Sequence, residues 1–342
     1  MQTQKEMTKK EISRIKEQLD SPKKIIITTH QLPDGDAMGS SLAFYHYLLQ
    51  KGHKATVISP SNYPNFLKWL PGNDNVLNYY LDKDLIIKRF DEADMMFCLD
   101  YNTPDRAKGL KELVTSFDGI KIVIDHHPDP DDFGDYMLSV VSSSSTAELI
   151  FEFITSLGDR GLINKDVAAC IYTGILTDTG SFSYGSTSAN AHYIAGEMIK
   201  AGADNLMIQD HIFQSNTEDR IRLLGYAISE KLKVVKDLNV AYIMLSIEDL
   251  EKFNFQQGDT EGLVNHALSI NKVSLAVLMT EKTGSVKFSF RSSGKCPANL
   301  IAKEHFNGGG HRNAAGGERS GTLQDAETQF LAIILNYKDK LT

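Results

Sequence analysis

The sequence predicts an α/β protein with a doubly wound, mostly parallel sheet, followed by a second, smaller α/β domain. Short apolar runs rich in β-branched residues, typical of buried strands, alternate with stretches of helical apolar spacing. Strands that alternate with helices favour a parallel sheet. At 342 residues, the chain is longer than one hydrophobic core usually supports, so two domains are expected.

The first half of the chain predicts a βαβ unit and two further strands. A charged amphipathic helix at the N-terminus is broken at Ser21-Pro22. Polar, acidic or histidine residues follow the strands, where ligands of doubly wound proteins bind. The predicted strands cover residues 24–30, 54–60, 95–100 and 120–127, and a helix over residues 37–51 ends at Gly52.

The second half changes from helices to strands. Residues 142–145, with Thr146 and Glu148, predict a helix N-terminus, and residues 144–207 read as mostly helical. Residues 167–182 predict a buried helix that opens into a polar loop holding Asp178. Beyond residue 232, strands come first and helices follow, with a hairpin turn at residues 283–285. The predicted domains are residues 1–210 and 233–342, joined by a helical linker at residues 211–232.

The net charge of −8 argues against a grip on long nucleic acid, because neutralisation of phosphates dominates that kind of binding. A phosphate substrate would then meet bound metal and a few placed basic residues. No stretch approaches the roughly 18 apolar residues of a membrane helix. The charged N-terminal segment lacks a signal-peptide core, so we expect a cytoplasmic protein. Three isolated cysteines indicate neither a disulfide framework nor a cysteine zinc site.

Histidine and aspartate residues gather after the predicted strands and in the polar loop. Four aspartates packed together would repel each other unless cations hold them. Mixed Asp/His ligation without cysteine suits Mn²⁺, with Mg²⁺, Co²⁺ or Zn²⁺ less favoured. Two ions about 4 Å apart can share a bridging hydroxide and stabilise charge that develops on phosphorus. The six candidate ligands are His30, Asp34, Asp36, Asp100, His126 and Asp178.

A glycine-rich segment, FNGGGHRNAAGG, covers residues 306–317. Gly308, Gly309 and Gly310 predict a loop whose backbone approaches a ligand closely. Its N–H groups would cradle an anion, with His311 as a further donor. A flexible surface loop is the alternative interpretation.

Taken in order, HQLPDGDAMGS, CLD, DHH, TDTGSF and GGGHRNAAGG resemble the successive motifs of the DHH phosphoesterase superfamily, in its DHHA1-bearing subfamily. The resemblance spans residues 24–317 and is nearest to the bacterial oligoribonucleases that degrade nano-RNA and dephosphorylate 3′-phosphoadenosine 5′-phosphate. It implies that His30, Asp34 and Asp100 bind one metal ion. It implies that Asp36, Asp100, His126 and Asp178 bind a second ion, with Asp100 bridging the two.

The resemblance also implies roles for residues outside the ligand set. His127 would contact the scissile phosphate and protonate the leaving oxygen, and Asp125 would orient the histidines. The substrate would lie in a cleft between the two domains. Gln31-Leu32 and Tyr101 depart from the family's pattern and are expected to affect substrate preference. The implied substrate-binding residues are Arg106, Arg291, Gly308, Gly309, Gly310 and His311.

Several functions stay open. The first is hydrolysis of short RNA or 3′-phosphoadenosine 5′-phosphate to mononucleotides, with a cyclic or linear di-AMP phosphodiesterase as its variant. A pyrophosphatase or exopolyphosphatase is less favoured, because the C-terminal domain offers a glycine-rich histidine loop instead of a dense Lys/Arg cluster. A non-catalytic nucleotide sensor is disfavoured because all six ligand positions are filled. We expect small-nucleotide partners, no long nucleic acid and no membrane, and a homodimer stays open.

Overall fold

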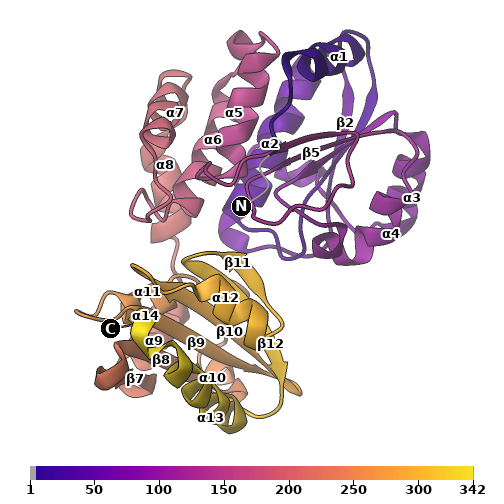
Figure 1. Ribbon diagram of the computed structural model, residues 1–342. Coiled ribbons are helices and arrows are strands. Elements are labelled where there is room, and N and C mark those ends of the chain that lie inside the picture. Colours follow the sequence, from indigo (N-terminus) through magenta and orange to yellow (C-terminus); the bar gives the residue numbers. More distant parts are fainter. Residues whose placement is uncertain (1–4, 342) are drawn as a thin grey trace. The chain divides into compact units, whose positions relative to one another are not determined.

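The computed structural model describes residues 5–341, and the chain divides into two compact units (Figure 1). One unit ends at Ser215 and the other begins at Asn216. The division falls within residues 211–232, the segment predicted as a helical linker. Within the described residues, no helix is long and apolar enough to cross a membrane.

The first unit is built on a six-stranded, wholly parallel sheet in the order β3-β2-β1-β4-β5-β6. From β1 the chain adds β2 and β3 toward one edge of the sheet, and it then returns to add β4, β5 and β6 toward the other edge. The strand order therefore reverses between β1 and β4. Such a reversal opens a crevice at the carboxyl ends of the two strands. The doubly wound sheet is therefore confirmed, and only the short strands β3 and β6 escaped the sequence prediction. The strands are β1 (Lys24–Thr28), β2 (Lys54–Ser59), β3 (Leu77–Asn78), β4 (Met95–Leu99), β5 (Ile120–Asp125) and β6 (Tyr136–Ser139).

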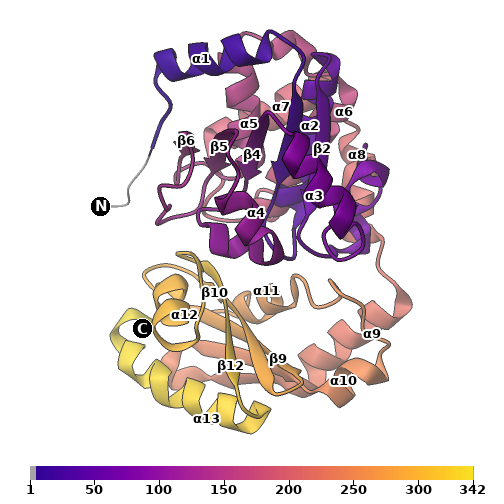
Figure 2. The same cartoon turned by 90° about the vertical axis from the view of Figure 1, so that its right-hand side faces the viewer.

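Helices cover both faces of this sheet, as Figures 1 and 2 show. In β1, Ile25 and Ile27 point into one hydrophobic core and Ile26 into the other, because successive strand residues face opposite sides. Burial on both faces explains why the strands read as continuous apolar runs. On the side of Ile25 lie α1 (Lys9–Leu19), α2 (Gly35–Gln50), α5 (Thr146–Ser156), α6 (Lys165–Asp178), α7 (Ala189–Lys200) and α8 (Asn205–Gln209), and on the other side lie α3 (Lys83–Glu92) and α4 (Lys111–Thr115).

The second unit has a mixed six-stranded sheet in the order β11-β12-β10-β9-β8-β7. Only β8 and β9 pair in parallel. The predicted hairpin is confirmed: β9 and β10 are antiparallel, with Lys282 opposite Ser285 across a two-residue turn. Gly284 in that turn has a φ of +78°, which glycine adopts without strain. The strands are β7 (Leu232–Val235), β8 (Val240–Leu245), β9 (Leu275–Lys282), β10 (Ser285–Ser292), β11 (Gly309–His311) and β12 (Ala314–Ser320).

This second sheet also has a core on each face. Phe288 and Phe290 of β10 pack with α12 and α13, whereas Ala276 and Leu278 of β9 pack with α9, α10 and α11. Each unit therefore has its own buried core. The helices are α9 (Glu218–Tyr226), α10 (Ile247–Lys252), α11 (Leu263–Leu268), α12 (Ala298–His305), α13 (Leu323–Ile334) and α14 (Lys338–Leu341).

The predicted loop at residues 306–317 is wrong: most of it forms the antiparallel hairpin β11–β12. Gly309 pairs with Gly316 and Gly310 with Ala315. A Cβ atom on Gly310 would lie 2.6 Å from the carbonyl oxygen of Ala314, and Gly310 has a φ of +134°. The glycines thus allow two backbones to pack closely within the sheet, a use that glycine spacing alone did not distinguish from a ligand-binding loop.

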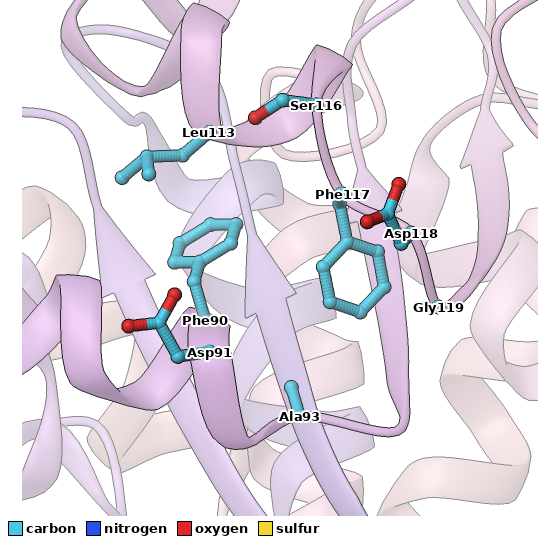
Figure 3. Close-up of a pocket in the computed structure, with 8 residues that line it drawn as sticks. All are labelled: Phe90, Asp91, Ala93, Leu113, Ser116, Phe117, Asp118 and Gly119. Carbon is cyan, nitrogen blue, oxygen red and sulfur yellow. The ribbon is translucent and has the colours of Figure 1, made fainter.

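A cavity of about 280 Å³ lies beside α3 and α4 (Figure 3). Two of its lining residues, Ala93 and Gly119, come just before β4 and β5, so it opens at the amino ends of these strands. The rings of Phe90 and Phe117 form one apolar wall, 6.2 Å apart between centroids. The cavity is therefore at the sheet edge opposite the candidate ligands described next.

Candidate metal centre

The first cluster forms where β1 ends and α2 begins. Asp34 is the N-cap of α2, and its Oδ1 accepts hydrogen bonds from the N–H groups of Asp36 and Ala37, both at 3.0 Å. Its other oxygen, Oδ2, lies 3.9 Å from Nε2 of His30. The Pro-Asp-Gly turn thus serves both as helix cap and as carrier of a ligand atom.

Asp100 lies at the centre of the site, directly after β4. Its backbone has a φ of +66°, a left-handed conformation that aspartate tolerates better than most residues. The side chain is buried, with Oδ2 at 3.3 Å from Nε2 of His30 and Oδ1 at 3.6 Å from Nε2 of His126. The two oxygens of one carboxylate therefore face two different histidines.

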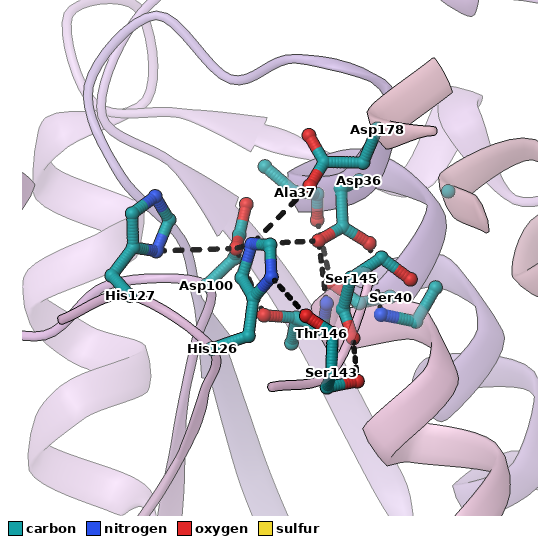
Figure 4. A network of polar contacts seen from close by, with 12 residues as sticks. Asp36, Ala37, Ser40, Asp100, His126, His127, Ser143, Ser145, Thr146 and Asp178 are labelled. Atoms are coloured by element: carbon teal, nitrogen blue, oxygen red, sulfur yellow. Dashed lines mark hydrogen bonds and ion pairs between the residues drawn. The ribbon is translucent and has the colours of Figure 1, made fainter. Parts of the chain in front are cut away.

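The second cluster surrounds His126, which follows β5 (Figure 4). Its Nε2 lies 3.7 Å from Oδ2 of Asp36 and 3.4 Å from Oδ2 of Asp178. Asp36 is in the first turn of α2, and Asp178 is the last residue of α6. The prediction of Asp178 in a polar loop is wrong, because the buried helix continues to this residue before the loop begins.

The charges in this site are crowded. Burial raises the pKa of Asp36, and the neighbouring carboxylates of Asp100 and Asp178 raise it further. Burial also raises the pKa of Asp100. The hydrogen bond and charge of His30, together with the charges of His126 and Arg106, outweigh burial and lower that pKa to about 2. Bound cations would relieve this repulsion, and carboxylate oxygens with imidazole nitrogens are suitable donors for them. His30, Asp34 and Asp100 form one group of atoms close enough to hold an ion, and Asp36, His126 and Asp178 form another.

His127 and Asp125 form a pair beside the two clusters. Nδ1 of His127 is 2.7 Å from Oδ1 of Asp125, and the backbone N–H of His127 donates to Oδ2 of Asp125 at 3.0 Å. Asp125 is fully buried, and this burial raises its pKa to about 7. With Nδ1 held by Asp125, Nε2 is the ring atom that would handle a proton from outside the pair.

Arg106 lies near the clusters, in the helical turn Pro104–Leu110. Its positive charge opposes the effect of burial on the pKa values of Asp100 and Asp125, although the pKa of Asp125 stays raised. Its carbonyl oxygen accepts the N–H of Gln31 at 2.7 Å. Among the described residues, its guanidinium group has no hydrogen-bond or ion-pair partner, so its donors are available to an anion.

Tyr101 points away from the site. Its side chain is fully buried, its hydroxyl is 2.6 Å from Oγ1 of Thr28, and its ring stacks on Phe133. Its side chain lies in the hydrophobic core with Ile26 and Cys98, so any effect of Tyr101 on substrate preference, which stays a prediction, would be indirect. Leu32, which belongs to the other departure from the family's pattern, is 48% exposed and has a φ of +55°. Its effect on substrate preference stays a prediction.

The remaining predicted substrate-binding residues belong to the second unit. Arg291 lies on β10, opposite Ala314 of β12, and its Nη1 donates to the carbonyl oxygen of Phe290 at 3.0 Å. Gly309, Gly310 and His311 form β11, with Gly308 just before it. Their part in binding stays a prediction.

Sequence reasoning missed one residue that contacts the ligand set. The hydroxyl of Thr146, at the start of α5, donates to Oδ1 of Asp100 at 2.8 Å. The segment was predicted as a helix N-terminus, and this is confirmed by the Ser145 cap. Only the contact in the folded structure reveals that the helix begins against the carboxylates of candidate ligands.

Two family models match the chain. The DHH family, N-terminal domain, matches residues 24–175, and the DHHA1 domain matches residues 237–338. The first match ends within α6 and contains every candidate ligand except Asp178. The chain belongs to the DHH/DHHA1 phosphoesterase family. It is accordingly a metal-dependent phosphoesterase, and its His/Asp clusters are consistent with the DHH metal site.

Proteins similar to this one align with it over nearly its whole length. The probable bifunctional oligoribonuclease and PAP phosphatase NrnA of Streptococcus mutans is 31% identical over 85% of this chain and 88% of its own length. The bifunctional oligoribonuclease and PAP phosphatase NrnA of Thermus thermophilus is 28% identical over 93% of this chain and 90% of its own. The crystal structure of an exopolyphosphatase-related protein from Bacteroides fragilis superimposes with a TM-score of 0.93, at 41% identity over 98% of both chains.

Proposed function

We propose that this DHH/DHHA1 protein hydrolyses short oligoribonucleotides and 3′-phosphoadenosine 5′-phosphate to mononucleotides, with two Mn²⁺ ions as cofactors. The observation that carries the two-ion part is the orientation of Asp100, whose oxygens lie 3.3 Å from His30 and 3.6 Å from His126. The names of the relatives from Streptococcus mutans and Thermus thermophilus support the substrate class.

The proposed ligands divide between two ions as the two clusters do. His30, Asp34 and Asp100 would hold one ion, and Asp36, Asp100, His126 and Asp178 the other. When bound, such ions polarise a phosphoryl oxygen and lower the pKa of water. Mn²⁺ suits the mixture of carboxylate oxygen and imidazole nitrogen.

The chain's own residues would bind the phosphate and move the proton. Asp125 holds Nδ1 of His127, which orients the ring and leaves Nε2 to deliver a proton to the leaving oxygen. The guanidinium group of Arg106 would pair with a non-bridging phosphate oxygen. In the second unit, Arg291, His311 and the backbone of Gly308 to Gly310 would bind the rest of the nucleotide.

The charge of the whole chain favours small substrates over long ones. At a net charge of −8, the protein would repel an extended polyanion, whereas one or two phosphates can be met by the ions and a few basic side chains. A short substrate also fits a histidine- and glycine-containing hairpin better than pyrophosphate does, since pyrophosphate calls for a denser basic cluster.

A turnover panel on metal-free protein tests the proposal. The substrates are a dinucleotide, a five-nucleotide RNA, 3′-phosphoadenosine 5′-phosphate, linear and cyclic di-AMP, and pyrophosphate, each with Mn²⁺, Mg²⁺ or Zn²⁺. We expect mononucleotide release from the first three with Mn²⁺, and none after chelation. Preferential turnover of cyclic di-AMP or pyrophosphate would replace the proposed substrate, and activity in excess chelator would reject the metal chemistry.

A further inference from the structure

The turn that begins α5 contacts three candidate ligands of one ion. This α5 turn, residues 143–148, lies next to the cluster of Asp36, His126 and Asp178 (Figure 4). The N–H groups of Thr146 and Ala147 donate to the two carboxylate oxygens of Asp36, at 2.6 and 2.8 Å. A donor on each oxygen fixes the rotation of the Asp36 carboxylate.

The same turn also orients His126 and Asp100. The carbonyl oxygen of Ser143 is 3.3 Å from Nδ1 of His126. A proton on Nδ1 that donates to this oxygen leaves the lone pair on Nε2, which faces Asp36 and Asp178. The hydroxyl of Thr146 donates to Oδ1 of Asp100, which is the oxygen that faces His126.

Buried partners hold the α5 turn itself in place. Glu148 is only 3% exposed, and its Oε2 accepts hydrogen bonds from the N–H and the hydroxyl of Ser144, at 2.9 and 2.6 Å. Its Oε1 accepts from Nδ2 of Asn190 on α7, at 2.6 Å. These three hydrogen bonds to one buried side chain tie the turn to α7 without the help of an ion.

The Thr146 hydroxyl makes a contact that the helix does not need. Other helical threonines donate to a carbonyl of their own helix, as Thr155 does to Phe151 and Thr173 does to Ala169, both at 2.8 Å. The cap of α5 is supplied by Ser145, whose hydroxyl accepts the N–H of Glu148. Thr146 is fully buried, and its hydroxyl points out of the helix to Asp100.

We propose that Thr146 is a positioning residue for the bridging Asp100, and that the α5 turn presets Asp36, His126 and Asp100, three of the four proposed ligands of one ion. The proposal rests on the two-ion function given above. Because Thr146 contacts Oδ1 and not the Oδ2 that faces His30, its loss weakens one ion selectively. The ion at His30 and Asp34 keeps its affinity.

Metal titration of Thr146→Val, which removes the hydroxyl and keeps the side-chain shape, tests this assignment. Mn²⁺ is added to metal-free protein, and binding is followed by electron paramagnetic resonance and calorimetry. Wild type is expected to bind two ions. In Thr146→Val the ion at His30 is expected to bind as in wild type, and the other ion about 10- to 100-fold more weakly. Thr146→Ser, which restores a hydroxyl, recovers most of that affinity.

Thr155→Val is the matched control, because it removes a hydroxyl from the same helix at its far end. It is expected to leave both affinities unchanged. Thr146→Ala serves as a second variant if valine perturbs folding, and melting in excess chelator measures that perturbation. Equal weakening of both ions, unchanged binding in Thr146→Val and Thr146→Ala, or a serine variant as impaired as valine would each overturn the proposal. Failure of wild type to bind two ions would instead refute the proposed two-ion function.

Discussion

Asp100 shows how one residue's backbone conformation creates the geometry of a site. Parallel strands end at a common edge, but a strand that simply continued would carry this side chain toward one face of the sheet. The left-handed conformation, with φ at +66°, turns the chain at the end of β4. The carboxylate then lies between His30 and His126, which follow β1 and β5, the strands on either side of β4.

Asp100→Asn is expected to abolish hydrolysis while the fold is retained. The amide keeps the size of the side chain but has one weak acceptor and no charge, so neither ion keeps its shared ligand. The loss in kcat should exceed the about 100-fold that loss of an outer-shell partner costs. Turnover in Mn²⁺ and far-ultraviolet circular dichroism measure the two effects. Asp118→Asn, at the opposite edge of the sheet, is the control, and near-normal turnover in Asp100→Asn would refute the bridging role.

The histidines make the stability of the metal-free protein depend on pH. Burial lowers the pKa of His30, but the hydrogen bond and charge of Asp100 outweigh it and raise the pKa above 6.5. At His126, burial also lowers the pKa, but the charges of Asp178, Asp100 and Asp125 together outweigh it and raise the pKa. A histidine whose pKa is higher in the folded state than in the unfolded state stabilises the folded protein below about pH 6.5. This stabilisation is lost as the pH rises through the folded-state pKa.

Two melting series check this dependence. In excess chelator, the free energy of unfolding should fall as the pH rises from about 6.5 through the raised histidine pKa values, and the raised pKa of Asp36 acts in the same direction. In saturating Mn²⁺ the trend should weaken or reverse, because metal binding requires deprotonated histidines and strengthens as the pH rises. A metal-free melting temperature that rose with pH across this window would contradict the shifts.

At the scale of elements, α2 and α6 must approach closely for their ligands to meet. A Cβ atom on Gly39 of α2 would lie 2.6 Å from the carbonyl oxygen of Cys170 and 2.9 Å from the nitrogen of Gly174, both on α6. Backbone atoms cannot rotate away as a flexible side chain does. The glycine therefore sets the spacing between the helix that carries Asp36 and the helix that ends at Asp178.

Gly39→Ala is expected to destabilise the first unit by about 1–3 kcal/mol, because the methyl group forces the two helices apart. Binding of the ion at Asp36 and Asp178 should weaken as well. Chemical denaturation and Mn²⁺ titration measure these changes. Gly196→Ala in α7 is the control: its added methyl group meets nothing within 4 Å, and alanine should stabilise that helix by up to about 1 kcal/mol. Unchanged stability in Gly39→Ala would mean that the helices separate without cost.

At the scale of the whole molecule, two units with separate cores carry an overall negative charge. Each sheet is covered on both faces by its own helices. The net charge is −8, so binding of phosphates depends on local groups and ions. The size of the substrate should then be limited by the number of phosphates that those groups can meet.

The salt dependence of KM measures how many substrate phosphates the protein neutralises. For single-stranded nucleic acid, each neutralised phosphate contributes a slope of about 0.7 to the logarithm of affinity against the logarithm of salt concentration. A dinucleotide or five-nucleotide RNA should give a slope of about 1.4 or less, equivalent to two phosphates. A slope that grew steadily with RNA length would show an extended binding track and contradict the preference for short substrates.

Much of the fold, and the gathering of the candidate ligands, could be predicted because both depend on short patterns. Strands such as residues 24–30 are marked by burial on two faces, and parallel strands bring His30, Asp100 and His126 to one edge. The short strands β3 and β6 have too few residues for a period to appear. The hairpin at Gly309 was mistaken for a loop, because glycine frees the backbone in both settings and only the pairing with Gly316 decides between them.

Residue types and the order of the strands were enough to predict which residues gather and which chemistry they suit, since both are local properties of the chain. Tertiary structure alone decided how they meet: Asp178 comes from a helix end, and the two oxygens of Asp100 face different histidines. It also placed Thr146 against Asp100, a residue 46 positions away. Such contacts follow from how helices pack on the sheet, and that packing depends on the whole core.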